Sequence, residues 1–166
     1  MAVASSRQWL TVKEVARVAS HLTGRSCSPR QVRHLLVTGG LGTDARRRTH
    51  GQTRLYGILD VAFVRLALRL EQEGVSPWVV RVVLTYLRND LVRAWKASAA
   101  VALAIDGLKG SLEPALKSRP ASATTWVPLR EIWRGVETEI ERACDARETV
   151  WMWRRVSVHA VPRAGV

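Results

Sequence analysis

Apolar positions recur at intervals of three and four residues along much of this chain, which is the spacing of one face of an α-helix. The first such stretch follows Thr11. Glu14 stands three residues after Thr11, which is the pattern of a capping box at a helix start, and Gly24 is typical of a helix end. We therefore predict a helix between residues 11 and 24 with one apolar stripe, formed by Val12, Val15, Ala16, Ala19 and Leu22.

A second helix is predicted to begin at Ser28, because Pro29 follows it. Proline is favoured in the first turn of a helix, where its missing N–H would have no intrahelical partner. Gly39 and Gly40 mark the predicted end of this helix. The link over residues 24–27 is longer than the tight turn of the simplest helix-turn-helix. The apolar face consists of Val32, Leu35 and Leu36.

The pattern changes in residues 46–56 (RRRTHGQTRLY). His50 and Gly51 are suited to a hairpin turn, and residues 53–56 alternate as a returning strand does. Two more helices are predicted after this basic hairpin. The first runs from Asp60 to Gly74, and the second begins at another Ser-Pro pair, Ser76–Pro77.

The pattern is weaker beyond residue 90. Residues 92–96 and 99–106 are predicted to pair as a β-hairpin, because the run ends at the turn dipeptide Asp106–Gly107. Residues 117–125 have the composition of a surface linker, and residues 128–146 have a helical apolar stripe. Residues 150–158 fit either a helix or a strand, and the tail from His159 is predicted to be frayed.

Charge indicates the kind of partner. With 166 residues, of which 47% are hydrophobic, the chain is long enough for one full core, or for one small domain and an accessory one. Its net charge of +12 favours polyanionic partners, nucleic acid first and an anionic membrane surface second. Residues 1–90 carry 14 Lys and Arg against 6 Asp and Glu, so +8 of the excess lies there.

Cys27 and Cys144 belong to no CxxC motif and have no histidine at metal-ligand spacing. They are expected to be free thiols of a reducing cytosol. The longest apolar run, residues 99–105, is far shorter than the ~20 residues of a membrane-spanning helix. The first residues also lack the apolar segment of a signal peptide. We therefore expect a cytoplasmic, nucleoid-associated protein that makes no membrane contact.

The second predicted helix carries side chains that can read base edges. The major groove of B-DNA admits a helix, and polar side chains on its leading turns reach the bases. A solvated face of an ordinary surface helix is the alternative for this element alone, since helix-turn-helix patterns are degenerate. The candidate base-contacting residues are Ser28, Arg30, Gln31, Arg33 and His34.

The basic hairpin adds candidate phosphate contacts. Unpaired charge is costly to bury, so its three consecutive arginines must be solvated or paired with anions, and DNA phosphates are such anions. Arg54 and Tyr56 stand two residues apart, on the same side of a strand, and both are expected to face the DNA backbone. A basic loop without function is the alternative for this run alone. The other candidates in this segment are Arg46, Arg47, Arg48 and His50.

These motifs, in this order, resemble the winged helix-turn-helix of MerR-type transcriptional regulators, over about residues 9–90. The junction into the fourth helix is similar as well. The resemblance is carried by residues 11–16 (TVKEVA), 28–33 (SPRQVR), Gly39, Leu41, 54–56 (RLY), 60–61 (DV) and 70–76 (LEQEGVS).

The resemblance implies that residues 28–34 enter the major groove, that Arg54 and Tyr56 hold phosphates, and that Thr11 adds a backbone contact. Members of the family are dimers joined through a C-terminal antiparallel helix. They often distort promoter DNA and so permit transcription by RNA polymerase. This chain has His34-Leu35 where the family has two aromatic residues, and its candidate dimerisation helix, at 128–146, does not follow the fourth helix directly.

The C-terminal part leaves two questions open. A helix over 128–146 would suit pairing across a two-fold axis, and packing within its own chain is an equal alternative; its stripe consists of Leu129, Ile132, Val136, Ile140 and Ala143. An aromatic-lined effector pocket is conceivable, but core packing is favoured for the seven tryptophans, Trp9, Trp78, Trp95, Trp126, Trp133, Trp151 and Trp153.

Enzyme motifs are missing from the sequence. It contains no phosphate loop, nucleotide fingerprint, nucleophile elbow or pair of catalytic carboxylates. The acidic residues at 131–141 alternate with arginines, which is typical of an exposed, ion-paired helix face. We expect no enzymatic activity, no cofactor and no metal.

The predicted fold is mainly α. Residues 1–90 form a winged helix-turn-helix domain with a two-stranded wing, and residues 91–166 form a smaller α+β region that ends in a helix for dimerisation or effector sensing. The expected function is sequence-specific regulation of transcription by a homodimer on double-stranded DNA. One alternative is a DNA-architectural factor of the excisionase kind. Another is a basic module that binds an acidic protein or RNA.

Overall fold

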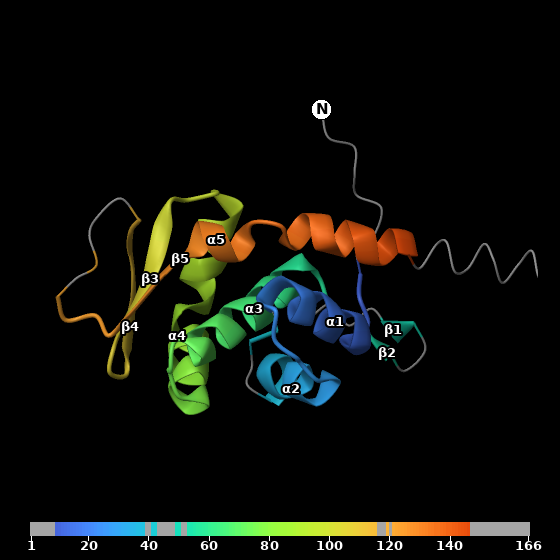
Figure 1. Ribbon diagram of the computed structural model, residues 1–166, viewed down its shortest axis with the longest axis horizontal. Coiled ribbons are helices and arrows are strands. Elements are labelled where there is room, and N and C mark those ends of the chain that lie inside the picture. Colours follow the sequence, from blue (N-terminus) through green and yellow to red (C-terminus); the bar gives the residue numbers. More distant parts are fainter. Residues whose placement is uncertain are drawn as a thin grey trace, which may run out of the picture.

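The computed structural model describes residues 9–38, 41–42, 49–50, 53–115, 119 and 121–146. The protein is mainly helical, with a three-stranded antiparallel sheet at one end and a two-stranded ribbon at the other (Figure 1). The elements in chain order are α1 (Val12–Thr23), α2 (Pro29–Arg33), the π-helical turn η1 (His34–Thr38), β1 (Thr49–His50), β2 (Thr53–Arg54), α3 (Ile58–Gln72), α4 (Pro77–Lys96), β3 (Val101–Asp106), β4 (Lys109–Pro114), β5 (Thr125–Pro128), α5 (Leu129–Trp133) and a last helix over residues 136–146.

Helix α1 begins and ends where its sequence predicts. The backbone N–H of Thr11 donates to Glu14 Oε2 at 2.7 Å, and the N–H of Glu14 donates to Thr11 Oγ1 at 3.4 Å, so the capping box is complete. Gly24 follows the helix with a φ of 65°, a left-handed conformation that glycine adopts without a steric penalty. This prediction is confirmed.

The second predicted helix begins as expected at Ser28 but is not one regular α-helix. Only residues 29–33 are α-helical, and the chain then widens into η1. The carbonyl of Leu36 accepts a hydrogen bond from the N–H of Gly42 at 2.9 Å, which closes the end of the turn. A Cβ at position 42 would lie 2.8 Å from that carbonyl oxygen, so this close return of the backbone requires glycine.

The predicted basic hairpin is present as the β1–β2 ribbon. Thr49 pairs with Arg54 and His50 pairs with Thr53, in antiparallel register. His50 was expected in the turn and instead lies in β1. The returning strand ends at Arg54, two residues earlier than its alternation predicts.

Helices α3 and α4 form the middle of the molecule. Helix α3 begins at Ile58, two residues before the expected start, because Asp60 acts as a cap: its Oδ2 accepts from the N–H of Gly57 at 2.8 Å. Ser76 caps α4 as predicted. The expectation of a strand at 92–96 is wrong, since α4 continues to Lys96. Its buried stripe extends through Leu91 and Ala94, which keeps these residues helical.

The sheet has the order β4-β3-β5. A turn is present next to the predicted Asp106–Gly107 pair, but Asp106 lies in β3, the turn residues are Gly107 and Leu108, and the turn joins β3 to β4 rather than ending a hairpin with residues 92–96. Strand β5 pairs with the other edge of β3. The predicted linker therefore ends one residue early, because Thr125 lies in β5 and is buried.

The helix predicted over residues 128–146 is broken. Helix α5 ends at Trp133, Gly135 adopts a φ of 80°, and a second helix covers residues 136–146. The Nη1 of Arg65 on α3 donates to the carbonyls of Ile132 and Arg134 at the break, both at 2.5 Å. The apolar stripe that was a candidate for dimerisation is buried inside its own chain, at Leu129, Ile132, Val136 and Ile140. The stripe therefore packs within its own chain, which is the alternative that the sequence leaves open.

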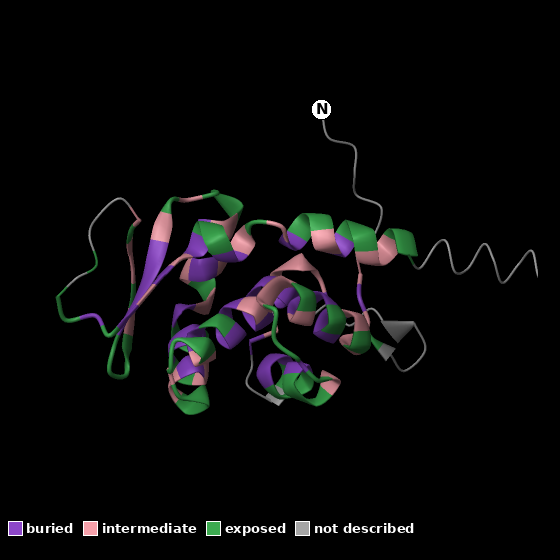
Figure 2. Cartoon of the chain, viewed as in Figure 1, coloured by how far each residue is buried: buried purple, intermediate pink, exposed green. Residues whose placement is uncertain are grey.

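The buried residues form one cluster that runs from Leu10 to Ile140. Figure 2 shows them on the facing sides of α1, α3, α4 and β3. The boundary expected near residue 90 falls inside α4, so both parts of the chain share this core. Trp95 and Trp133 meet edge to face, with centroids 5.2 Å apart, and the cavity that they border measures only about 10 Å³, so this is core packing rather than an effector pocket.

Two further outcomes concern the ends of the chain and the membrane. The segment at 150–158, with Trp151 and Trp153, and the tail from His159 lie outside the described residues. In the described ranges, no helix is long and apolar enough to cross a membrane.

Candidate nucleic-acid interface

The link between α1 and α2 is fixed by Ser20. Its hydroxyl donates to the carbonyl of Ala16 at 2.7 Å and accepts from the N–H of Cys27 at 2.8 Å. Cys27 is buried, and this burial raises the pKa of its thiol, with a further contribution from the carboxylate of Glu71. The thiol therefore stays protonated and serves as a packing group. These contacts hold the extended link in one conformation.

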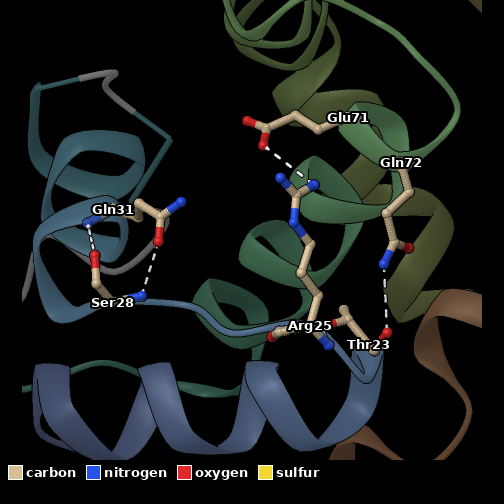
Figure 3. A network of polar contacts seen from close by, with 6 residues as sticks. All are labelled: Thr23, Arg25, Ser28, Gln31, Glu71 and Gln72. Atoms are coloured by element: carbon tan, nitrogen blue, oxygen red, sulfur yellow. Dashed lines mark hydrogen bonds and ion pairs between the residues drawn. The ribbon is translucent and has the colours of Figure 1, made fainter.

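A second pair of contacts ties the end of α1 and the link to the end of α3. The guanidinium Nη1 of Arg25 lies 4.0 Å from Glu71 Oε2, and the Nε2 of Gln72 donates to the carbonyl of Thr23 at 3.4 Å. Figure 3 shows Arg25 reaching across from the link to Glu71 on α3. The start of α2 is therefore positioned by α3 as well as by α1.

Helix α2 opens with its own capping box. The N–H of Ser28 donates to Gln31 Oε1 at 2.8 Å, and the N–H of Gln31 donates to Ser28 Oγ at 3.2 Å. The sequence predicts both residues as base contacts, and the structure shows that both cap the helix. The Nε2 group of Gln31 points away from Ser28 (Figure 3), so its two donors face outward.

The polar face of α2 and η1 borders an open hollow of about 490 Å³. All five candidate base-contacting residues line it. Leu35 and Leu68 contribute apolar walls, and Glu71 of α3 forms another part of the rim. The hollow is lined by Ser28, Arg30, Gln31, Arg33, His34, Leu35, Leu68 and Glu71.

The charge of this surface is positive. Arg30 and Arg33 are exposed, and the carboxylate of Glu71 already faces the guanidinium of Arg25. On the opposite side of the helix, Val32 and Leu36 are buried and attach the segment to the core. The predicted division into an exposed cationic face and an apolar face is confirmed.

The exit from η1 is fixed by a residue that the sequence does not single out. Arg88 of α4 donates from Nη2 to the carbonyl of Gly42 at 2.6 Å. Leu41, next to it, is fully buried. The partners are 46 positions apart, so no local pattern identifies Arg88. The contact fixes the backbone at Gly42, shortly after η1.

The other residues predicted to contact DNA differ in exposure, and some of them lie outside the described part of the chain. Arg54 is exposed on β2, and Thr11 is half-buried with its hydroxyl donating to Glu14 Oε2 at 2.9 Å. Arg46, Arg47 and Arg48 lie outside the described residues, and so does the side chain of His50.

The prediction that Tyr56 contacts DNA phosphates is wrong, because its side chain is buried. We expected it to face phosphates beside Arg54, but it is only 5% exposed. Its N–H donates to the carbonyl of Leu10 at 2.8 Å, and its own carbonyl accepts from Leu10 at 2.9 Å. This bridge aligns the residue with the segment before α1, and its side chain joins the core.

No family model matches the chain, and comparison with curated proteins and with solved structures gives no significant match. The function must therefore be inferred from the chemistry of this surface. It offers guanidinium, imidazole and amide donors on a short, braced helix. Such groups recognise anions and hydrogen-bond acceptors.

Proposed function

We propose that this protein binds double-stranded DNA with sequence specificity and regulates transcription, as a winged helix-turn-helix protein of MerR-like type. In this proposal α2 and η1 enter the major groove, and the β1–β2 ribbon lies along the phosphate backbone as the wing. The observation that carries it is the exposed set of Ser28, Arg30, Gln31, Arg33 and His34, which lines one open cationic hollow while the buried Val32 and Leu36 anchor the same segment.

The donors have the chemistry that base edges require. Arginine can bind the N7 and O6 acceptors of guanine with two hydrogen bonds, and an outward amide can contact adenine or other acceptors. Arg30 and Arg33 supply the first kind of group and Gln31 the second. Contacts to bases specify a sequence, whereas Arg54 would neutralise a phosphate whatever the sequence.

The bracing supports a recognition role. Ser20 fixes the link before α2, and Arg88 fixes the exit from η1. A surface held in this way loses little conformational freedom on binding, so more of the contact energy contributes to affinity.

The test begins with selection of bound sequences from a random duplex library. Fluorescence anisotropy then measures the affinity for the selected and a scrambled duplex across salt concentrations. Arg30→Ala should lose about 1–3 kcal/mol of discrimination between the two. Arg54→Ala should weaken both equally and reduce the slope of log K against log salt by about 1. Arg130→Ala removes an exposed charge on α5 and is the matched control.

The recovered motif distinguishes the competing functions. A regulator should select a palindrome, and transcription from a promoter containing it should respond to the protein in the presence of RNA polymerase. An architectural factor should instead bind direct repeats cooperatively. Absence of any specific duplex affinity would leave an interaction module for acidic proteins or RNA and refute the proposal.

A further inference from the structure

Helix α4 has a second apolar face. Trp78, Val82 and Tyr86 are 53%, 37% and 81% exposed, and they stand four residues apart, so they lie on one side of the helix. The residues of the opposite side, such as Val83 and Leu87, pack into the core and against β4. Among the described residues, the other large hydrophobic side chains with this degree of exposure are Val37 and Leu108, which belong to other elements of the chain.

The spacing of this face makes it self-complementary. Val82 stands midway between the two aromatic residues, which are about 12 Å apart along the helix axis at 1.5 Å per residue. If two α4 helices cross antiparallel at Val82, Trp78 of one chain meets the partner's Tyr86 at each end. A two-fold axis requires this kind of patch, in which each residue contacts its counterpart reciprocally.

We propose that the Trp78–Val82–Tyr86 face of α4 binds the same face of a second copy of this chain. The proposal deepens the proposed function, because a palindromic DNA site requires a two-fold symmetric protein. It assigns the dimer contact to α4 rather than to residues 128–146, whose apolar stripe is buried within the chain.

The area is sufficient for a small interface. From their exposed fractions, the six residues of two copies expose roughly 700 Å² in total, most of it apolar, which is the most that this face alone can bury. The smallest stable interfaces bury about 1,200 Å² in total, and somewhat more than half of that is apolar. The face therefore supplies the apolar centre of such an interface, with polar neighbours completing the rim.

The charges at the two ends of α4 favour the antiparallel arrangement. Arg93 and Lys96 lie in its last turn, and Glu73 lies at the junction that precedes its first turn. All three are exposed, and within the chain Glu73 pairs with Arg69 at 2.7 Å and Arg93 pairs with Asp90 at 2.5 Å, so a contact between the two copies would extend these surface ion pairs. Antiparallel pairing directs the basic end of each helix toward the acidic junction of the other, whereas parallel pairing would bring the two basic ends together. Complementary charge of this kind selects the orientation of a complex.

Sedimentation velocity on the full chain, without DNA and over a wide concentration range, tests the proposal. The wild-type protein should show a reversible monomer–dimer equilibrium. Val82→Glu should raise the dimer dissociation constant by about a hundredfold or more, because it places two like charges face to face on the two-fold axis. Leu108→Glu makes the same change on an exposed residue outside α4 and should leave the equilibrium unchanged.

Mixing two charged variants tests the antiparallel register itself. Trp78→Lys and Tyr86→Glu each weaken the homodimer, but their mixture restores one aromatic contact and adds one ion pair. Native mass spectrometry should therefore detect more heterodimer than either homodimer. A wild-type monomer at all concentrations, equal effects of Val82→Glu and Leu108→Glu, or a mixture without excess heterodimer would each overturn the proposal.

These measurements contain no DNA, so their outcome is separate from that of the proposed function. A dimer through α4 without specific duplex affinity would retain the interface and reject the regulator. Specific duplex binding by a monomer would do the opposite.

Discussion

At the residue scale, Gly110 shows how closely β4 lies against α4. A Cβ at this position would overlap Val83 Cγ1 and approach Leu87 Cδ1 to 3.1 Å. The overlap would not be relieved easily, because Val83 is a branched, buried side chain with little freedom to move.

Gly110→Ala should lower the free energy of unfolding by about 1–3 kcal/mol, as overpacking of a core does. Val83→Ala removes the methyl group that the new Cβ would strike. Urea unfolding of the two single variants and the double variant measures their coupling. We expect the double variant to be more stable than the sum of the two single effects predicts, and strictly additive effects would contradict the close contact.

Single residues also show which parts of the candidate site the sequence could predict. Thr11, Ser28 and Gln31 act on neighbours three positions away, so their capping contacts are visible in the sequence. The partner of Arg88 is 46 positions away, and the bridge between Tyr56 and Leu10 is also distant in sequence. Such contacts depend on the folded chain, and no local pattern encodes them.

At the element scale, two helices begin with the same Ser-Pro pair. Ser28 caps α2 and Ser76 caps α4, each by accepting from the N–H three residues on. They differ in length, because α2 has five residues before the π-helical turn, whereas α4 has 20. A short helix has few other bonds of its own, so α2 depends more strongly on its cap.

Ser28→Ala and Ser76→Ala should each lower the free energy of unfolding by about 1 kcal/mol, as loss of an N-cap does. Only Ser28→Ala should also weaken binding to the selected DNA duplex, because it loosens the helix that carries Arg30 and Gln31. Denaturant unfolding and fluorescence anisotropy on both variants make the comparison. An equal loss of DNA affinity in the two variants would argue against recognition by α2.

The errors at this scale have physical causes. Residues 92–96 are β-branched and aromatic in part, but the buried stripe of α4 reaches Leu91 and Ala94 and holds them in the helix. Strand β5 follows a segment of linker composition, and its strand conformation depends on pairing with β3. The break at Gly135 was missed because the apolar spacing continues across it. Tertiary contacts decided all three cases.

At the scale of the whole molecule, Arg65 joins the helices of residues 1–90 to the C-terminal end of α5. It lies on α3 and donates to two carbonyls at the end of α5. Burial lowers the pKa of its guanidinium, with a smaller effect from Arg69, and the two hydrogen bonds offset part of that desolvation.

Arg65→Met keeps most of the aliphatic stem and removes both hydrogen bonds. We expect the free energy of unfolding to fall by about 1–3 kcal/mol, since the partly buried carbonyl of Ile132 and the exposed carbonyl of Arg134 lose a charged donor. Differential scanning calorimetry of the whole chain should still show one transition, at a lower Tm. Arg130→Met on exposed α5 surface is the control, and an equal effect of the two substitutions would contradict the role of Arg65.

Helix α4 crosses the point at which the sequence predicts a domain boundary, and this limits how the molecule can be divided. A fragment that stopped near residue 90 would lose Leu91 and Ala94 from the helix and the whole sheet that covers Val83 and Leu87. The candidate DNA-binding part is therefore not a cassette that can be moved into a fusion protein by itself. A fusion protein that contains the candidate DNA-binding helices must also contain the whole of α4 and the three-stranded sheet.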